Sequence, residues 1–386
     1  MDDKNLEDMQ DPIASQMVKI SSRLQERVVE EFSPIVGAKE DLRGKLLFEG
    51  LIHKVDVSSY PQVGSMAAVD GARIQEKLYA GDFLVALATL ANALRTPEKY
   101  EAENLLWADI MQHVDGTDRV SQTAMGSGEV HLLSRANHEV RIMDGSFVTP
   151  LIMLREGLFM KSHKIQAASA QILEERRSAE SLSYLIDKAH DGLVSIAKSD
   201  SATYFARDFD EKFGLRFPIS DRFLATQILQ PGEIFEPRVL RELEKQTVDV
   251  PKGNDKNVIK QAALLQVEYE RLGKMAKQGL IYTTYYRPVI IGNPEAVSGK
   301  NVIRIEFVVR EEDAKNVVEI AKRYAGILNS DMMGPYMLEP YCQHLVDRQA
   351  KSISETAKMF KNQMIAKLPS EQAAAYRELL MRGYRT

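Results

Sequence analysis

The sequence feature that most constrains the fold is a short apolar run that ends in Asp-Gly, which occurs twice. One run reads VRIMDGSFVTP over Val140–Pro150, and the other reads MAAVDGA over Met66–Ala72. A buried strand requires an apolar run of this length, and the glycine lets the backbone turn or pass close to a ligand. If both runs are strands of one sheet, Asp70 and Asp144 come together at its polar edge. Like charges that close are unfavourable unless a cation lies between them, so the pair indicates a metal site.

A local explanation of the two dipeptides stands beside this one. Asp-Gly is a common hairpin turn, and a single Asp-Gly after an apolar run is usually only that. The two runs together favour a shared site more than either run does, but periodicity alone leaves both explanations open.

Composition indicates a soluble globular protein. The chain has 386 residues, of which 44% are hydrophobic and 27% charged, which suits one large domain or two of ordinary size. No apolar run approaches the roughly 20 residues that cross a bilayer, and the acidic start MDDKNLEDMQD is unlike a secretory signal. A lone cysteine, Cys342, excludes an internal disulfide and a cysteine-based zinc site, so the expected compartment is the cytoplasm.

The charge balance limits how the chain could bind nucleic acid. The formal net charge is −5, whereas proteins that coat nucleic acid by bulk attraction are usually basic. Any contact with DNA must therefore come from local patches, from bound metal or from a partner.

The order of predicted elements favours an α/β sheet. A long helix over 161–190 precedes a strand that begins at Gly192, and the alternating runs Ile281–Ile291 and Asn301–Val309 predict a hairpin. The segment Phe83–Leu94 suits either a helix or a buried strand. The remaining expectations are disorder over 1–12, helices over 13–32, 100–113, 129–137, 220–231, 258–278, 311–325 and 370–384, a helix stop over 32–37, and polar connections over 115–128 and 248–257.

Six motifs in order resemble the NurA nucleases: AAVDGAR, a helix led by glutamate, VRIMDGSFVTP, GLVSIAKSDSA, SDRFLATQILQPGE and PYCQHLVDRQAK. The resemblance covers roughly Met66 to Ile353. It implies an α/β fold with an RNase H-like mixed sheet flanked by helices and with helical additions at both ends. The implied domains are an interaction segment at 1–60, a nuclease domain at 61–355 and a C-terminal helical extension at 356–386.

The resemblance also assigns metal ligands near the two Asp-Gly runs. Asp70 matches the first acidic ligand of the family and Asp144 the second. The family has a further glutamate upstream of the second aspartate, for which Glu129 is the best match and Glu139 the alternative.

Two more positions carry over from the C-terminal motif and from the third strand. Asp347 lines up with a ligand on a helix near the C-terminus, and His344, three residues earlier, is the alternative because it lies on nearly the same helical face. Lys198 matches a lysine at a strand end, where it would hold a DNA phosphate or stabilise charge in the transition state.

The resemblance therefore implies a deoxyribonuclease that hydrolyses phosphodiester bonds with two Mn²⁺ or Mg²⁺ ions. It further implies a homodimer that works with a hexameric HerA-type ATPase in DNA end resection, in repair or in antiphage defence. Two alternatives stay open. One is a non-catalytic adaptor that keeps the fold and binds the ATPase, and the other is a different RNase H-like nuclease, such as one of the transposase type.

Overall fold

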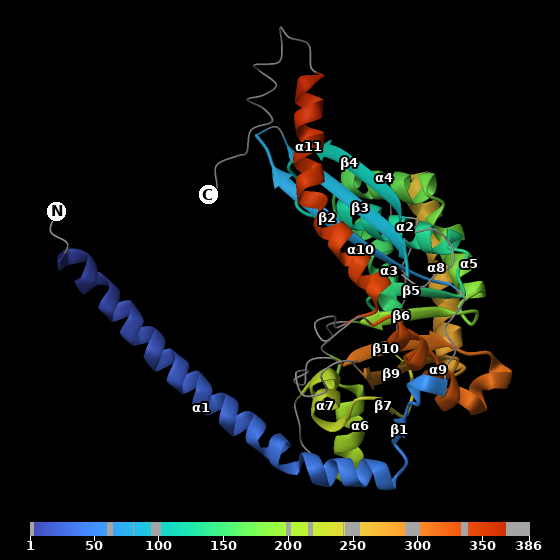
Figure 1. Ribbon diagram of the computed structural model, residues 1–386. Helices are drawn as coiled ribbons and strands as arrows, with labels where there is room; N and C mark the ends of the chain where they lie inside the picture. The colour runs from blue at the N-terminus through green and yellow to red at the C-terminus, as the bar shows by residue number, and fades with distance from the viewer. Residues whose placement is uncertain are drawn as a thin grey trace.

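A ten-stranded mixed sheet forms the centre of the described part of the chain in the computed structural model (Figure 1). The structure describes residues 4–59, 65–79, 81–93, 102–197, 202–214, 219–241, 243, 255–289, 302–332 and 339–367. The strand order is β1-β7-β9-β10-β6-β5-β2-β3-β4, and β8 pairs with β9 outside this path. The strands are β1 (Ile52–Lys54), β2 (Met66–Lys77), β3 (Asp82–Asn92), β4 (Ala102–Met111), β5 (Val140–Asp144), β6 (Leu193–Ala197), β7 (Glu233–Phe235), β8 (Arg238–Val239), β9 (Ile281–Arg287) and β10 (Ile303–Val308).

Helices cover both faces of this sheet. The α-helices are α1 (Lys4–Phe48), α2 (Asp118–Arg135), α3 (Val148–Glu156), α4 (His163–Glu175), α5 (Ser178–Asp187), α6 (Tyr204–Phe213), α7 (Asp221–Ile228), α8 (Lys256–Lys277), α9 (Val317–Ser330), α10 (Tyr341–Lys351) and α11 (Ile353–Ala366). Short 3₁₀ turns occupy η1 (Val57–Ser59), η2 (Gly157–Phe159) and η4 (Glu311–Asn316). Within the described ranges, no helix combines the length and the apolar character that crossing a membrane requires.

Two hydrophobic cores lie on opposite faces of the central strands. Val69 of β2 and Met143 of β5 belong to the core beneath α2, α4, α5 and α8. Ala68 of β2 and Ile142 of β5 belong to the other core, which α9 and α10 cover. Successive side chains of a strand point to opposite faces, so both strands contribute to both cores.

The mixed α/β fold and the strands that carry both Asp-Gly motifs are confirmed. The strand after Gly192 and the helix over 258–278 are also confirmed, as is the pairing of β9 with β10. The undecided segment 83–94 is strand β3, buried along its whole length. The predicted hairpin turn, most of the connection over 248–257 and the helix over 370–384 lie outside the described residues.

Several boundaries differ from the predictions. Residues 102–111 form β4 and not a helix, because pairing with the buried strand β3 satisfies their backbone and overrides local preference. The expected polar connection over 115–128 is mostly the first half of α2. The single helix over 161–190 is two helices, α4 and α5, separated where Arg177 adopts a left-handed backbone with φ of 49°.

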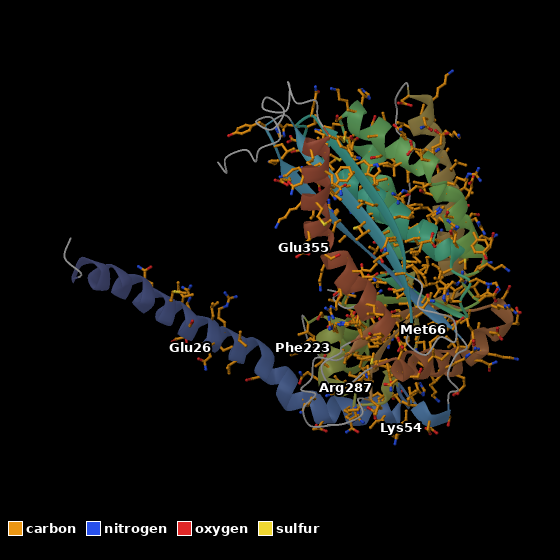
Figure 2. The ribbon with its side chains drawn as sticks, turned by 45° about the horizontal axis from the view of Figure 1, so that its top comes forward. Glu26, Lys54, Met66, Phe223, Arg287 and Glu355 are labelled. Atoms are coloured by element: carbon orange, nitrogen blue, oxygen red, sulfur yellow. The ribbon has the colours of Figure 1, made fainter. Side chains whose placement is uncertain are left out.

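The N-terminal predictions of disorder over 1–12 and a helix stop over 32–37 are wrong, because α1 is continuous from Lys4 to Phe48. Tertiary contacts hold its last turns: Leu42 and Leu46 are buried against the body, and Arg43 forms two hydrogen bonds of 2.7 Å with Glu233. Packing of this kind stabilises helices more than local preference does. The other end of α1 extends away from the body, where Figure 2 labels Glu26.

Candidate metal centre

The two aspartates occupy adjacent positions on neighbouring parallel strands. β2 pairs in parallel with β5, and Val69 opposite Met143 is the last registered pair, so Asp70 and Asp144 are the next residue on each strand. Neighbouring strands lie roughly 4.8 Å apart. Asp70 lies two positions after Ala68, and Asp144 lies two positions after Ile142. Side chains two positions apart on a strand share a face, so both aspartates belong to the face that α10 covers.

The chain turns directly after Asp144, where β5 ends. Gly145 has a φ of +91°, a conformation that glycine adopts without strain. Its N–H still bonds to the carbonyl of Ile196 at 2.8 Å, and its carbonyl accepts a hydrogen bond from Ser195. The third parallel strand, β6, thereby holds the backbone immediately after Asp144.

Glu129 reaches the two aspartates from α2, on the opposite face of the sheet, because Gly71 has no side chain. A Cβ atom at Gly71 would lie 2.3 Å from Glu129 Oε1 and 2.5 Å from Met125 Cγ. The carboxylate of Glu129 therefore lies against the backbone of β2 beside Asp70. Burial raises the pKa of Glu129 well above its usual value, and the charges of Asp70 and Asp144 raise it further.

Gln343 approaches the same site from α10. Its Nε2 donates a hydrogen bond of 2.5 Å to Asp144 Oδ1, and its side chain is fully buried. The helix packs across β2 and β3, where Gln349 Oε1 accepts a hydrogen bond of 2.6 Å from Thr89. Gln343 is not among the site residues predicted from the sequence, although it lies one helical turn before Asp347 and therefore on the same face of the helix.

The two residues expected on α10 have other described partners. Asp347 lies one turn after Gln343 on the same helical face and accepts a hydrogen bond of 2.5 Å from Lys351. His344 lies with its Nδ1 3.6 Å from Glu339 Oε1 and with its ring beside that of Tyr341. On α10, the hydrogen bond that the structure gives to Asp144 comes from Gln343.

The remaining expected positions lie apart from these residues or outside the described chain. Glu139 precedes β5, at the end opposite Asp144, and its carboxylate is 3.7 Å from Arg323. Between the two candidate glutamates, the geometry therefore favours Glu129. Lys198 lies outside the described residues.

A buried ion pair on β10 supports the turn after Asp144. Glu306 accepts hydrogen bonds from the backbone N–H of Phe147 at 2.8 Å and from the hydroxyl of Ser146 at 2.9 Å. Its carboxylate also lies 2.7 Å from the guanidinium of Arg304, and both side chains are almost fully buried. Sequence analysis missed this pair, although two charged residues in an otherwise apolar strand are a recognisable signal.

The donor set suits a hard divalent cation. Asp70, Glu129 and Asp144 offer carboxylate oxygens, and Gln343 adds an amide oxygen that is buried without a hydrogen-bond partner. Mg²⁺ and Mn²⁺ prefer oxygen ligands of this kind. Among the described residues, however, no group of three or more His, Cys, Asp or Glu side chains is already gathered closely enough to hold a metal ion.

Comparison with known proteins finds matches to this chain among solved structures. No family model matches the sequence, and no curated protein matches it either. A NurA nuclease from Sulfolobus solfataricus matches with a TM-score of 0.55 and 14% identity, over 90% of this chain and 99% of that chain. A second NurA structure also has a TM-score of 0.55, with 12% identity over 92% of this chain and 99% of the other.

A further NurA structure, bound to dAMP and manganese, matches with a TM-score of 0.48 and 12% identity over 91% of this chain and 99% of that chain. The first two matches span nearly the whole length of both partners. The protein thus has the mixed α/β, RNase H-like fold of the NurA nucleases.

Proposed function

We propose that this protein is a divalent-metal-dependent deoxyribonuclease that hydrolyses phosphodiester bonds. The observation that carries the proposal is the meeting of Asp70 and Asp144 on adjacent parallel strands, with the buried Glu129 close enough to be affected by both charges. Repulsion between the half-buried Asp70 and Asp144 and the buried Glu129 is relieved by binding a cation. The likeness to NurA nuclease structures supports the same chemistry.

The residues at this site have two kinds of proposed role, metal binding and positioning of the metal ligands. Asp70, Asp144 and Glu129 would hold Mn²⁺ or Mg²⁺, which when bound in pairs supply an activated water and stabilise the departing oxygen. Gln343 orients Asp144 through its amide N–H, and Glu306 fixes the turn that follows Asp144. Asp347, or His344 in its place, and Lys198 remain proposed as further members.

Cleavage of linear DNA in Mn²⁺, in Mg²⁺ and in EDTA tests the proposal. We expect cleavage with either metal and none in EDTA. We also expect Asp70→Asn and Asp144→Asn to abolish cleavage while the circular dichroism spectrum is retained, because each removes one anionic ligand without changing side-chain volume. Asp109→Asn on the exposed surface of β4 is the matched control and should cleave at the wild-type rate. Wild-type cleavage by either site variant would contradict the assignment.

We further propose a homodimer that acts on DNA with a HerA-type hexameric ATPase, in end resection, repair or antiphage defence. Residues 1–60 would be the interaction segment, since α1 exposes apolar side chains at helical spacing. These are Met17, Ile20, Leu24 and Val28. The proposed nuclease domain is 61–355, and the extension at 356–386 begins on α11, where Ala357 packs against the sheet. Co-purification with a ring ATPase tests this partnership.

A non-catalytic adaptor that binds the same ATPase is the second candidate. The observation that favours it is that the described acidic side chains are not already gathered into a metal-binding group. An adaptor would co-purify with the ATPase and leave DNA intact in Mn²⁺ and Mg²⁺, whereas the nuclease would cleave. Cleavage without any ring ATPase as partner would instead favour another RNase H-like nuclease.

A further inference from the structure

We infer that Gln343 of α10 is a member of the cation site, and that its amide oxygen is a ligand. This inference rests on the proposed function, because it requires a divalent cation between Asp70 and Asp144. It adds a neutral ligand from the helix that also carries Asp347 and His344.

The first argument is the unsatisfied oxygen of this side chain. Gln343 has no exposed surface, its Nε2 is bonded to Asp144 Oδ1, and its Oε1 has no hydrogen-bond partner. A buried acceptor without a donor is destabilising, and such groups in native proteins commonly mark an ion or a function. A cation would supply the missing partner.

The second argument is where that oxygen lies. Oε1 and Nε2 share one carbon atom, so Oε1 is within the width of one amide group from the Asp144 carboxylate. Asp144 itself stands beside Asp70 on the neighbouring strand. An amide oxygen is a hard ligand that adds no charge, which suits a site already crowded with three carboxylates.

The third argument is the orientation of the amide. The N–H group faces the carboxylate of Asp144, and the reverse orientation would place two oxygen acceptors against each other. The same hydrogen bond fixes the orientation of the Asp144 carboxylate, as groups that hydrogen-bond to metal ligands commonly do. The opposite end of the amide is then available to the cation.

Mn²⁺ binding measured by calorimetry, without DNA, tests the inference. We expect Gln343→Met to weaken Mn²⁺ binding about tenfold to a hundredfold, while the metal-free protein stays folded, because removal of the unsatisfied acceptor offsets loss of the hydrogen bond to Asp144. The matched control is Gln349→Met on the same helix, whose amide oxygen already accepts from Thr89. This control should bind Mn²⁺ as the wild type does.

Gln343→Glu separates a ligand from a positioning residue. This variant keeps an oxygen and loses the N–H, so a ligand role predicts tighter Mn²⁺ binding and a larger rise in melting temperature with Mn²⁺ than in the wild type. Weaker binding by Gln343→Glu would show that only the N–H matters and would overturn the inference. Wild-type affinity in Gln343→Met would overturn it too, while leaving the nuclease proposal intact. A wild-type protein that binds no Mn²⁺ would overturn both.

Discussion

Replacing Gly71 with alanine would place a methyl group in the space that the carboxylate of Glu129 occupies. The added carbon would lie 2.3 Å from Glu129 Oε1 and 2.5 Å from Met125 Cγ, with the carbonyl oxygen of Leu87 at 3.1 Å. Ordinary carbon–oxygen contacts are about 3.3 Å or longer. The carboxylate must therefore move by about 1 Å, away from β2 and from Asp70. Gly71 lies outside the left-handed region, so the backbone itself accepts alanine.

The magnitude follows from two opposing effects. Overpacking a well-packed interior destabilises a protein by about 1–3 kcal/mol. Replacing glycine with alanine also lowers the conformational entropy of the unfolded chain, which stabilises the folded state by about 0.4–1 kcal/mol. We expect Gly71→Ala to lower the free energy of unfolding by roughly 1–2 kcal/mol. A displacement of about 1 Å in a catalytic group can reduce the rate by about a hundredfold. The cleavage rate should therefore fall far more than the folded fraction.

Urea denaturation and initial rates of linear DNA cleavage in Mn²⁺ measure the two effects separately. Gly44→Ala is the control, because nothing lies within 4 Å of the added carbon and Gly44 is inside α1. Alanine there should leave the cleavage rate unchanged and stabilise the protein by about 0.5–1 kcal/mol. The reasoning is refuted if Gly71→Ala matches Gly44→Ala in both stability and rate, since Glu129 would then not depend on the missing side chain.

Two further predictions concern buried charge. Glu306→Ala should lower the free energy of unfolding by about 3–5 kcal/mol, because it leaves the guanidinium of Arg304 buried without this carboxylate. As a control, replacing the exposed Glu319 of α9 with alanine should change the free energy of unfolding by less than about 1 kcal/mol. Equal effects of the two substitutions in urea denaturation would contradict the buried ion pair. In EDTA, Glu129→Gln should be more stable than the wild type at neutral pH, because the raised pKa of Glu129 makes the folded state bind a proton that the unfolded state has lost. That advantage should grow as the pH rises above about 4.3, the unfolded value, and vanish below it; an advantage independent of pH would argue against carboxylate repulsion.

The success of sequence reasoning for the strands that carry Asp70 and Asp144 has a local cause. Each aspartate ends a short apolar run, and apolar runs bounded by glycine mark buried strands whatever the rest of the chain does. The same reasoning failed at 102–111, where the edge strand β4 forms only because β3 lies beside it. It also failed over 32–37, where a helix stop was predicted, because contacts of Leu42, Leu46 and Arg43 with distant residues hold the later turns of α1.

The site shows the same division between local and distant information. Glu129 was assigned by resemblance, but the reason that it reaches the aspartates is the missing side chain of Gly71, 58 positions earlier in the printed sequence. The only local signal for Gln343 was its position one turn before Asp347, and a glutamine on a helix is ordinarily a surface residue. Only the packing of α10 across β2 and β3 buries it and brings its amide to Asp144.

The sequence by itself therefore determined the α/β class and the strands that carry the aspartates, because hydrophobic periodicity acts over a few residues. The tertiary structure alone decided that Asp70 and Asp144 stand side by side, that Glu129 joins them through the space at Gly71, and that Gln343 contacts Asp144. These contacts depend on strand register and helix packing, which are set by residues far apart in the chain and leave no periodic trace in it.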